Sequence, residues 1–274
     1  MEDVAVIMSV YKADCCVHVK QAVESILNQT YTQLQLWVCF DGKLAPDVEA
    51  YFERLVYQDS RLQLLKKLEN KGLAISLNEI LKKVLPQKKF KFIARMDADD
   101  IAMPDRVEKQ VKFLQENSSV DCVGTWAIEI DGQEKEYFRK QMPETHEACK
   151  RLFMQRDFLI HPTVMFRAEY FEKVGLYPEE IKFLFNEDTM MWANGLKKGC
   201  QFANLPEYLL LFRLNESFFK RRQGIRHTLA ILKLRLKINW MLKYPPTAYL
   251  FAVAHSGVKL LPPALLDIAY RKLR

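Results

Sequence analysis

Apolar and polar positions along the first hundred residues predict strands and helices in turn. Residues 4–10 form a continuous apolar run of strand length, which is typical of a central parallel strand buried on both faces. Residues 17–29 follow with apolar positions at helical spacing. Further strands are predicted at 34–40, 62–65 and 90–96, and further helices at 46–57 and 73–84. Strands that alternate with helices predict an α/β fold with a mostly parallel sheet.

The second half of the chain has a less regular alternation. A helix is predicted from Pro104 to residue 117, because proline suits the first turn of a helix. The acidic pair Glu187-Asp188 suits the start of another helix, over 186–198. The other predicted elements are strands at 122–127, 128–130 and 163–166, a helix at 143–155 and a last apolar run at 206–214. The pattern therefore predicts one large α/β domain, or a domain with a substantial appendage.

Three carboxylates stand directly after the strand predicted at 90–96. Side chains of an extended chain repeat every two residues, so we expect Asp97 and Asp99 to point the same way at the carboxyl end of that strand. Open α/β sheets bind their ligands at such strand ends. Two close carboxylates repel each other unless a cation lies beside them, and oxygen ligands suit Mg²⁺ or Mn²⁺. The spacing alone fits a metal site and, equally well, an acidic turn before the helix that opens at Pro104.

Composition argues against several classes of protein. With 49% hydrophobic and 27% charged residues, the 274-residue chain is expected to be globular with a sizeable core. Its nine glycines form neither G-x-G-x-x-G nor G-x-x-x-x-G-K-[ST], which argues against a Rossmann dehydrogenase and a P-loop NTPase. Its six cysteines form no C-x-x-C pair and the first residues show no signal-type apolar run, so we expect free thiols in a reducing cytoplasm.

Positive charge is concentrated in the C-terminal part of the chain. The formal net charge is +7, and residues 218–274 alone hold twelve Lys and Arg against one Asp. Apolar residues recur near helical spacing between the basic ones, at Ile225, Leu229, Leu232, Leu236 and Trp240. Such basic amphipathic segments suit an anionic membrane surface, although no apolar run is long enough to span a bilayer. The alternatives are packing on the rest of the chain, pairing of two copies in a homodimer, and nucleic-acid binding.

Seven short motifs, taken in order, give the chain a family resemblance. They are MSVYK at 8–12, SILNQT at 25–30, DG at 41–42, NKGLA at 70–74, ARMDADD at 94–100, HPTVMF at 161–166 and ED at 187–188. Together they resemble the family 2 glycosyltransferases of the GT-A fold, in particular those that build bacterial capsule, O-antigen and exopolysaccharide repeat units. The resemblance runs from about residue 4 to about residue 222. Many members carry two acids before the first glycine, whereas here Phe40 precedes Asp41, and the last fifty or so residues match nothing as specific.

The resemblance implies a fold, a domain organisation and an activity. The fold would be a mixed, mainly parallel GT-A sheet with a C-terminal helical extension. Residues 1–217 would form the catalytic domain, with a nucleotide-binding half at 1–103 and an acceptor half at 104–217, and 218–274 would be a basic amphipathic tail. The activity would be inverting, metal-dependent transfer of a hexose (glucose, galactose or an N-acetyl form) from a UDP-sugar to a polyprenyl-diphosphate-linked saccharide, with a β-linkage. The enzyme would be cytoplasmic and peripheral on the inner face of the membrane, without a nucleic-acid partner. A nucleotidyltransferase is the enzymatic alternative, although the basic glycine-rich loop that such enzymes usually carry is missing.

The resemblance also assigns a donor site. Asp41 would accept a hydrogen bond from the uracil N3–H, although alone it reads as a turn former before Gly42. Arg95 would approach a phosphate, and the alternative is an ion pair with Asp97. Asp97 and Asp99 would form the D-x-D motif, with Asp97 near the ribose and Asp99 on Mn²⁺ or Mg²⁺, whereas Asp100 would be structural and bonded to nearby backbone. The remaining nucleotide-binding residues would be Val10, Tyr11, Lys71 and Gly72.

A second set of residues is implied on the acceptor side. Asp188 would be the general base, because a single displacement needs a carboxylate to take the proton of the acceptor hydroxyl. Glu187 would orient the site, with Trp192 packed one turn below it. Arg213, together with Ser217, would contact a phosphate. His161, before a proline, is interpreted as a hydrogen-bonded turn residue and is left out of catalysis.

Overall fold

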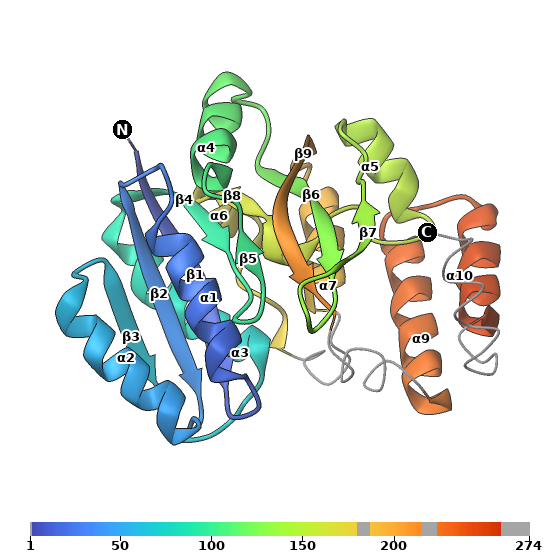
Figure 1. Cartoon of the computed structure of the whole chain (residues 1–274). Coiled ribbons are helices and arrows are strands. Elements are labelled where there is room, and N and C mark those ends of the chain that lie inside the picture. The colour runs from blue at the N-terminus through green and yellow to red at the C-terminus, as the bar shows by residue number, and fades with distance from the viewer. Residues whose placement is uncertain (1, 180–186, 215–223, 259–274) are drawn as a thin grey trace.

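All strands of the described residues (2–179, 187–214 and 224–258) belong to one nine-stranded sheet in the computed structural model (Figure 1). Their order is β3-β2-β1-β4-β8-β6-β9-β5, and β7 lies beside β6. The strands are β1 (Asp3–Tyr11), β2 (Leu34–Asp41), β3 (Leu62–Lys66), β4 (Phe90–Arg95), β5 (Ile101–Ala102), β6 (Cys122–Ile130), β7 (Glu136–Lys140), β8 (Met165–Arg167) and β9 (Phe202–Arg213). The long ladders are parallel and the antiparallel ones short, so the predicted mixed, mainly parallel sheet is confirmed.

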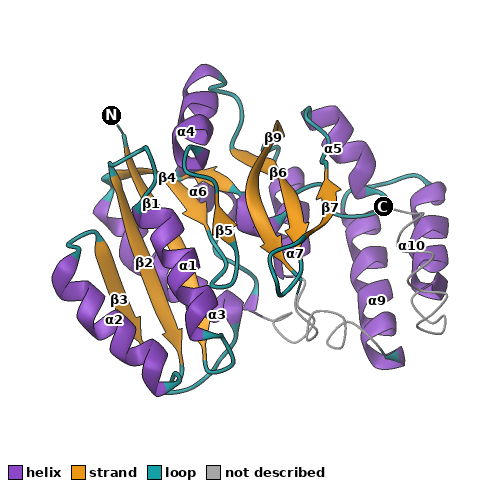
Figure 2. Cartoon of the chain, in the orientation of Figure 1, coloured by secondary structure: helices purple, strands orange, loops and turns teal. Residues whose placement is uncertain are grey.

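Helices cover both faces of this sheet (Figure 2). The helices are α1 (Cys16–Leu27), α2 (Pro46–Gln58), α3 (Leu73–Val84), α4 (Arg106–Glu116), α5 (His146–Phe153), α6 (Glu169–Val174), α7 (Glu187–Lys197), α9 (Ile225–Met241) and α10 (Pro246–Val258), with short 3-10 turns η1 (Leu85–Gln87) and η2 (His161–Thr163). Val4, Val6 and Met8 of β1 pack in one core cluster with α1, α2 and α4, whereas Ala5 and Ile7 pack in the other with α3, α5, α6, α7 and α9. The continuous apolar run of β1 is therefore explained by burial on both sides.

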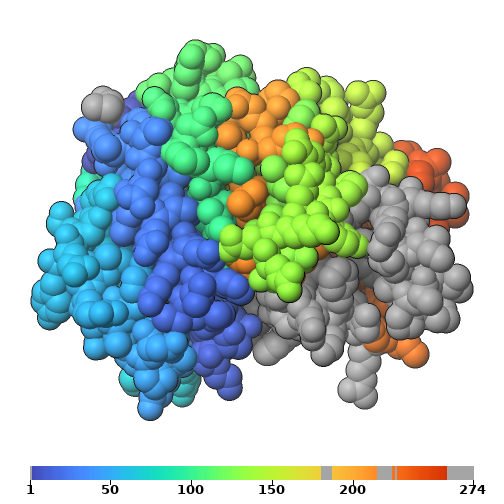
Figure 3. Space-filling model, viewed as in Figure 1, coloured from blue at the N-terminus to red at the C-terminus, as the bar shows by residue number. Residues whose placement is uncertain are grey.

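The strand–helix order predicted for the first hundred residues is confirmed. Differences arise where the sequence signal is weak: β5, β7 and α6 were not predicted, and they are short or carry polar residues. The strands predicted at 122–127 and 128–130 are one strand, β6. The helix predicted from 143 begins at His146, where the side chain of Thr145 accepts a hydrogen bond from the Ala148 N–H at 3.4 Å. In the space-filling view (Figure 3), the blue N-terminal segments lie on one side and the green segments from the middle of the chain lie beside them.

The C-terminal helical extension is present as α9 and α10. One face of α9 is part of the second core cluster through Leu234 and Ile238, which pack with residues of α7. Helix α10 lies against α9 and buries Ala248 and Ala252. Ser217 and, within the predicted basic tail, residues 218–223 and 259–274 lie outside the described residues. In the part of the chain that the structure describes, no helix has the length and apolar character needed to cross a bilayer.

Candidate active site

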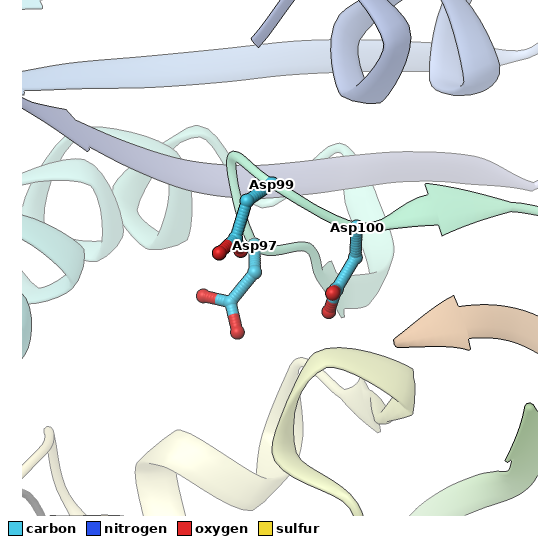
Figure 4. Close-up of side chains that lie close together, drawn as sticks. All are labelled: Asp97, Asp99 and Asp100. Carbon is cyan, nitrogen blue, oxygen red and sulfur yellow. The ribbon is translucent and has the colours of Figure 1, made fainter. Parts of the chain in front are cut away.

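Three carboxylates gather on the loop between β4 and β5 (Figure 4). Each of Asp97, Asp99 and Asp100 offers an oxygen, and these oxygens lie within 4.8 Å of one another on the same side of the loop. Burial, followed by the nearby charge of Asp97, raises the pKa of Asp99 to about 6. Burial, followed by the charge of Asp99, also raises the pKa of Asp100. Burial and the mutual repulsion of the carboxylates therefore both disfavour ionisation of the whole cluster.

This donor set fits a divalent cation. Hard oxygen ligands at short mutual distance suit Mg²⁺ or Mn²⁺, which takes one or two carboxylates together with phosphate oxygens. Asp100 supplies a further indication, because its Oδ2 is buried and has no hydrogen-bond partner among the described residues. Its Oδ1 accepts a hydrogen bond from the Arg213 backbone N–H at 2.8 Å, which confirms the predicted bond to backbone.

Arg95 lies beneath the acids at the end of β4. It is almost completely buried and forms an ion pair with Asp97, which is the structural alternative stated for it above. The guanidinium Nε and Nη1 have no hydrogen-bond partner within the described ranges. Arg106 of α4 fixes the backbone of Arg95, because its Nη2 donates to the Arg95 carbonyl oxygen at 2.5 Å. Arg95 therefore brings a fixed and only partly satisfied positive charge to the edge of the acidic cluster.

Arg213, at the end of β9, holds the acidic loop from the other side. Its Nε donates to the Asp99 carbonyl oxygen at 2.9 Å, and its Nη2 donates to Gln21 and Glu134 at 3.0 and 3.2 Å. The side chain is only 1% exposed. The structure thus gives Arg213 a positioning role for the loop, and its contact with a phosphate stays a prediction.

The nucleotide-binding residues predicted on the first two strands lie next to each other. Tyr11 and Asp41 are register partners at the ends of β1 and β2. Asp41 is nearly buried and accepts hydrogen bonds from Lys67 Nζ at 2.7 Å, from the Lys71 N–H at 2.8 Å and from the Gly72 N–H at 2.9 Å. Its carboxylate therefore holds the loop before α3 and retains little accepting capacity for a base.

The other residues predicted to contact the nucleotide differ in the solvent exposure of their side chains. Val10 is buried in the core, so only its backbone is available at the strand end. Lys71 is exposed and its ammonium lies 3.6 Å from Glu69. The turn at Gly42 is fixed by close approach, because a Cβ there would lie 2.8 Å from the Asn70 nitrogen at a φ of +85°. Tyr11, Lys71 and the backbone of residues 70–72 therefore frame the same end of the sheet.

The predicted acceptor residues lie in the first turn of α7. Glu187 is buried, and the partly exposed Asp188 accepts a hydrogen bond from the Thr189 N–H at 2.8 Å through Oδ1. Trp192 is buried one turn later and stacks on Phe166 with ring centroids 5.8 Å apart. Residue 186, with which the helix was predicted to begin, lies outside the described residues.

Tyr177 lies beside His161 and within the electrostatic range of both Arg95 and the start of α7. Burial raises the pKa of its hydroxyl, and the charges that act on it include Arg95 together with Asp188 and Glu187. Its hydroxyl lies 2.9 Å from His161 Nε2. Burial also lowers the pKa of His161, which is therefore neutral and serves as the hydrogen-bonded turn residue that was predicted.

Residues 5–175 match the sequence profile of the family described as glycosyl transferase family 2. The chain belongs to this family. It is therefore a glycosyltransferase, as the resemblance of its motifs indicated.

Relatives of this glycosyltransferase include one that is named for the biosynthesis of amylovoran. It is 28% identical over 273 residues to the putative glycosyltransferase EpsE of Bacillus subtilis, covering 99% of this chain and 94% of EpsE. It is 26% identical over 275 residues to the amylovoran biosynthesis glycosyltransferase AmsE of Erwinia amylovora, covering 98% of each chain. A third relative, 24% identical over 277 residues and covering 98% of this chain and 95% of its own, is the UDP-Gal:alpha-D-GlcNAc-diphosphoundecaprenol beta-1,3-galactosyltransferase of Escherichia coli.

Solved structures confirm the GT-A fold of the glycosyltransferase. TarS 1-349 of S. aureus in complex with UDP-GlcNAc aligns with a TM-score of 0.62 at 15% identity, covering 96% of this chain and 82% of that one. The mannosyltransferase PcManGT of Pyrobaculum calidifontis in complex with GDP-Man and Mn²⁺ aligns with a TM-score of 0.60 at 17% identity, covering 98% of this chain and 79% of that one. At these identities the likeness concerns the fold alone.

Several residues that shape the site were not found from the sequence. Lys67 donates to Asp41 and Arg106 donates to the Arg95 backbone, whereas Tyr177 bonds to His161. Lys67 stands among other lysines, Arg106 lies within an ordinary helical pattern, and Tyr177 belongs to no motif. Their roles depend on contacts between segments that are far apart in the sequence, so no local sequence pattern predicted these roles.

Proposed function

We propose that the protein is an inverting, metal-dependent transferase of a UDP-hexose to a lipid-linked saccharide, which it extends with a β-linkage during synthesis of a bacterial surface polysaccharide. The observation that carries this proposal is the carboxylate cluster Asp97, Asp99 and Asp100, fixed by Arg95 and Arg213 at the end of β4. The ligands and names of similar proteins support the donor and the acceptor in this proposal. TarS has been solved with UDP and UDP-GlcNAc, and the Escherichia coli relative is named for UDP-Gal and a diphosphoundecaprenol acceptor.

Each step of the proposed reaction can be assigned to particular residues. Asp99 and Asp97 would hold Mn²⁺ or Mg²⁺, which supplies positive charge to the diphosphate as the bond to the sugar breaks. Arg95, with two unsatisfied nitrogens, would add a fixed positive charge beside the same phosphates. Asp188 takes the proton of the acceptor hydroxyl while the oxygen of that hydroxyl bonds to the anomeric carbon, and UDP leaves with the electron pair of the broken carbon–oxygen bond. A single displacement of this kind inverts the anomeric centre.

The location that we propose is the cytoplasmic face of the membrane, where lipid-linked acceptors are elongated. The described part of the extension supports this, because it exposes large apolar side chains beside lysines. Trp240 is 77% exposed, Leu250 is 70% exposed, and Lys237 and Lys243 are exposed nearby in the sequence. Aromatic and basic side chains together favour a membrane interface. Copelleting with vesicles of anionic and of zwitterionic lipids tests this point, and no preference for the anionic vesicles would contradict it.

The donor is tested by thermal shift with UDP, GDP, CDP and dTDP, each with and without Mn²⁺. A nucleotide that binds only the folded state at a hundredfold excess over its Kd stabilises the protein by about 2.7 kcal/mol. We expect a shift with UDP that needs the metal. A metal-dependent preference for GDP, the base present in the PcManGT complex, would replace the UDP assignment.

Transfer is tested with UDP-glucose, UDP-galactose and their N-acetyl forms on a GlcNAc-diphosphoryl lipid. We expect Asp99→Asn and Asp188→Asn to lose transfer by at least about a hundredfold, in line with the weight of electrostatic and general-base contributions. Asp105→Asn is the matched control, because Asp105 lies just beyond the cluster in a half-exposed pair with Lys109. Near-normal transfer by either active-site variant would remove that residue from its assigned role.

A further inference from the structure

Arg235 is a buried cation in the middle of α9. Its side chain is 10% exposed, whereas its neighbours on the same helix, Lys233 and Lys237, are exposed. Its Nη2 donates to Asp157 Oδ1 at 2.8 Å, and its Nη1 donates to the Phe153 carbonyl oxygen at 3.2 Å. The guanidinium also lies over the Phe153 ring, 5.2 Å from its centroid. Arg235 therefore ties the C-terminal extension to the segment that follows α5.

The second oxygen of Asp157 continues this connection to the candidate active site. Asp157 Oδ2 accepts a hydrogen bond from Thr189 Oγ1 at 2.8 Å. Thr189 is 1% exposed, and its backbone N–H donates to Asp188 Oδ1 at 2.8 Å. Hydrogen bonds thus run from α9 through Asp157 to Thr189, the residue that directly holds the carboxylate of Asp188.

The first turn of a helix needs such support. Its N–H groups have no partners within the helix, so the geometry of the turn depends on side chains and on contacts from outside. In α7 the Thr189 N–H is satisfied by Asp188 itself, and the Thr189 hydroxyl is held by Asp157. Without Arg235, the carboxylate of Asp157, whose side chain is 29% exposed, would lose its bonded cation and would no longer be fixed in one rotamer. A displacement of about 1 Å at a reacting group can cost about a hundredfold in rate.

We propose that Arg235 is a positioning residue for transfer, acting through Asp157 and Thr189 on the carboxylate of Asp188. The inference rests on the proposed function, in which Asp188 is the general base. It makes α9 part of the catalytic apparatus and not only an attachment surface. Arginine suits the position because its planar fork serves two acceptors at once, which a lysine ammonium on a flexible stem does with less geometric definition.

The test compares Arg235→Met, Arg235→Lys and Thr189→Val with the unmodified protein. Thr189→Val keeps the shape of the side chain and removes only the hydroxyl. Lys233→Met is the matched control, because it removes one exposed charge from the same helix. The readouts are kcat and KM for the UDP-sugar in full-length protein, together with the Kd of UDP in the presence of Mn²⁺.

We expect Arg235→Met to lower kcat by about a hundredfold, while KM for the UDP-sugar and the Kd of UDP stay within about twofold. Thr189→Val should lower kcat in the same selective way, Arg235→Lys should retain part of the activity that Arg235→Met loses, and Lys233→Met should change nothing. If Arg235→Met does not fold, Thr189→Val decides the question alone. An unchanged kcat in folded Thr189→Val, or equal losses in kcat and in UDP binding, would overturn the inference.

Asp188→Asn separates this inference from the proposed function. If Asp188→Asn keeps near-normal transfer, the general-base assignment fails, whatever the Arg235 variants do. If Asp188→Asn is inactive and the Arg235 and Thr189 variants behave like the unmodified protein, only the positioning role fails. The double variant Asp188→Asn with Arg235→Met should be no slower than Asp188→Asn alone, because both changes act on the same group.

Discussion

Replacement of Asp41 by Asn tests how the loop before α3 is held. The carboxylate accepts three hydrogen bonds of 2.7 to 2.9 Å, from the ammonium of Lys67 and from the N–H groups of Lys71 and Gly72. In the variant, one carbonyl oxygen can still serve Lys67 and Lys71, but as a neutral acceptor it is weaker by about 1 kcal/mol for each bond. The amide NH₂ group would face the Gly72 N–H, and that bond, worth about 2 kcal/mol, is lost.

We therefore expect Asp41→Asn to lower the free energy of unfolding by about 3 to 4 kcal/mol. In a protein of this size, that corresponds to a drop in Tm of roughly 6 to 16 °C. Urea unfolding followed by circular dichroism measures the free energy, and a thermal scan measures Tm.

Glu79→Gln is the matched control for this experiment. Glu79 lies on α3 and pairs with Lys82, and both side chains are about half exposed, at 43% and 51%. An exposed pair of this kind is worth at most about 0.5 kcal/mol. A Tm for Asp41→Asn within about 2 °C of the unmodified protein would refute the reasoning. If the UDP affinity falls at an unchanged Tm, Asp41 acts on the base instead, as the family resemblance implied.

Three further predictions concern the turn, a buried histidine and the metal. Gly42→Ala should destabilise the fold by at least about 2 kcal/mol in urea unfolding, because of its positive φ and the approach of Asn70, whereas Gly132→Ala, which meets nothing within 4 Å, should stay within about 0.5 kcal/mol. Burial holds the pKa of His161 well below 6.5, so the unfolded chain takes up a proton that the folded protein does not, and stability should fall as pH drops below 6.5, by up to about 1.4 kcal/mol per pH unit. His161→Gln should remove that part of the slope between pH 7.5 and 5.5, and identical slopes would contradict this explanation. Chelation by EDTA should abolish transfer and Mn²⁺ should restore it, whereas full activity in EDTA would exclude a required metal.

The fold was predictable where one segment carries its own signal. The apolar run of β1 and the helical spacing of α1 identify buried elements without knowledge of their neighbours. Strand β5, in contrast, is the two-residue segment Ile101–Ala102 and exists because it pairs with Leu210 and Leu211 of β9. Strand β7 is largely exposed and polar, so it is recognisable only from its pairing with β6. These elements depend on partners far away in the sequence, which a local pattern does not contain.

The candidate site likewise contains some features that the local sequence predicts and others that depend on distant partners. The acidic cluster was expected from residues that are neighbours in the sequence, and the pair Arg95–Asp97 was one of two alternatives for Arg95. In α9 the helical spacing of apolar residues included Ile225, Leu229 and Trp240, and all three side chains are exposed. The apolar residues that α9 buries are Ile231, Leu234 and Ile238. The face that packs inward contains polar Arg235, which only its contact with Asp157 explains.

Strand β8 has a consequence for the order in which the protein folds during synthesis. Its three residues lie between β4 and β6, and Met165 and Phe166 each pair on both sides. Until this segment has left the ribosome, the two halves of the sheet have no strand to join them, and β4 keeps an open edge. On its other side β6 pairs with β9 (Phe202–Arg213), which is synthesised still later than β8. Pairings across such sequence separations form slowly. We therefore expect nascent chains that end before β8 to depend on chaperones, and the joining of the halves to be a late step in folding.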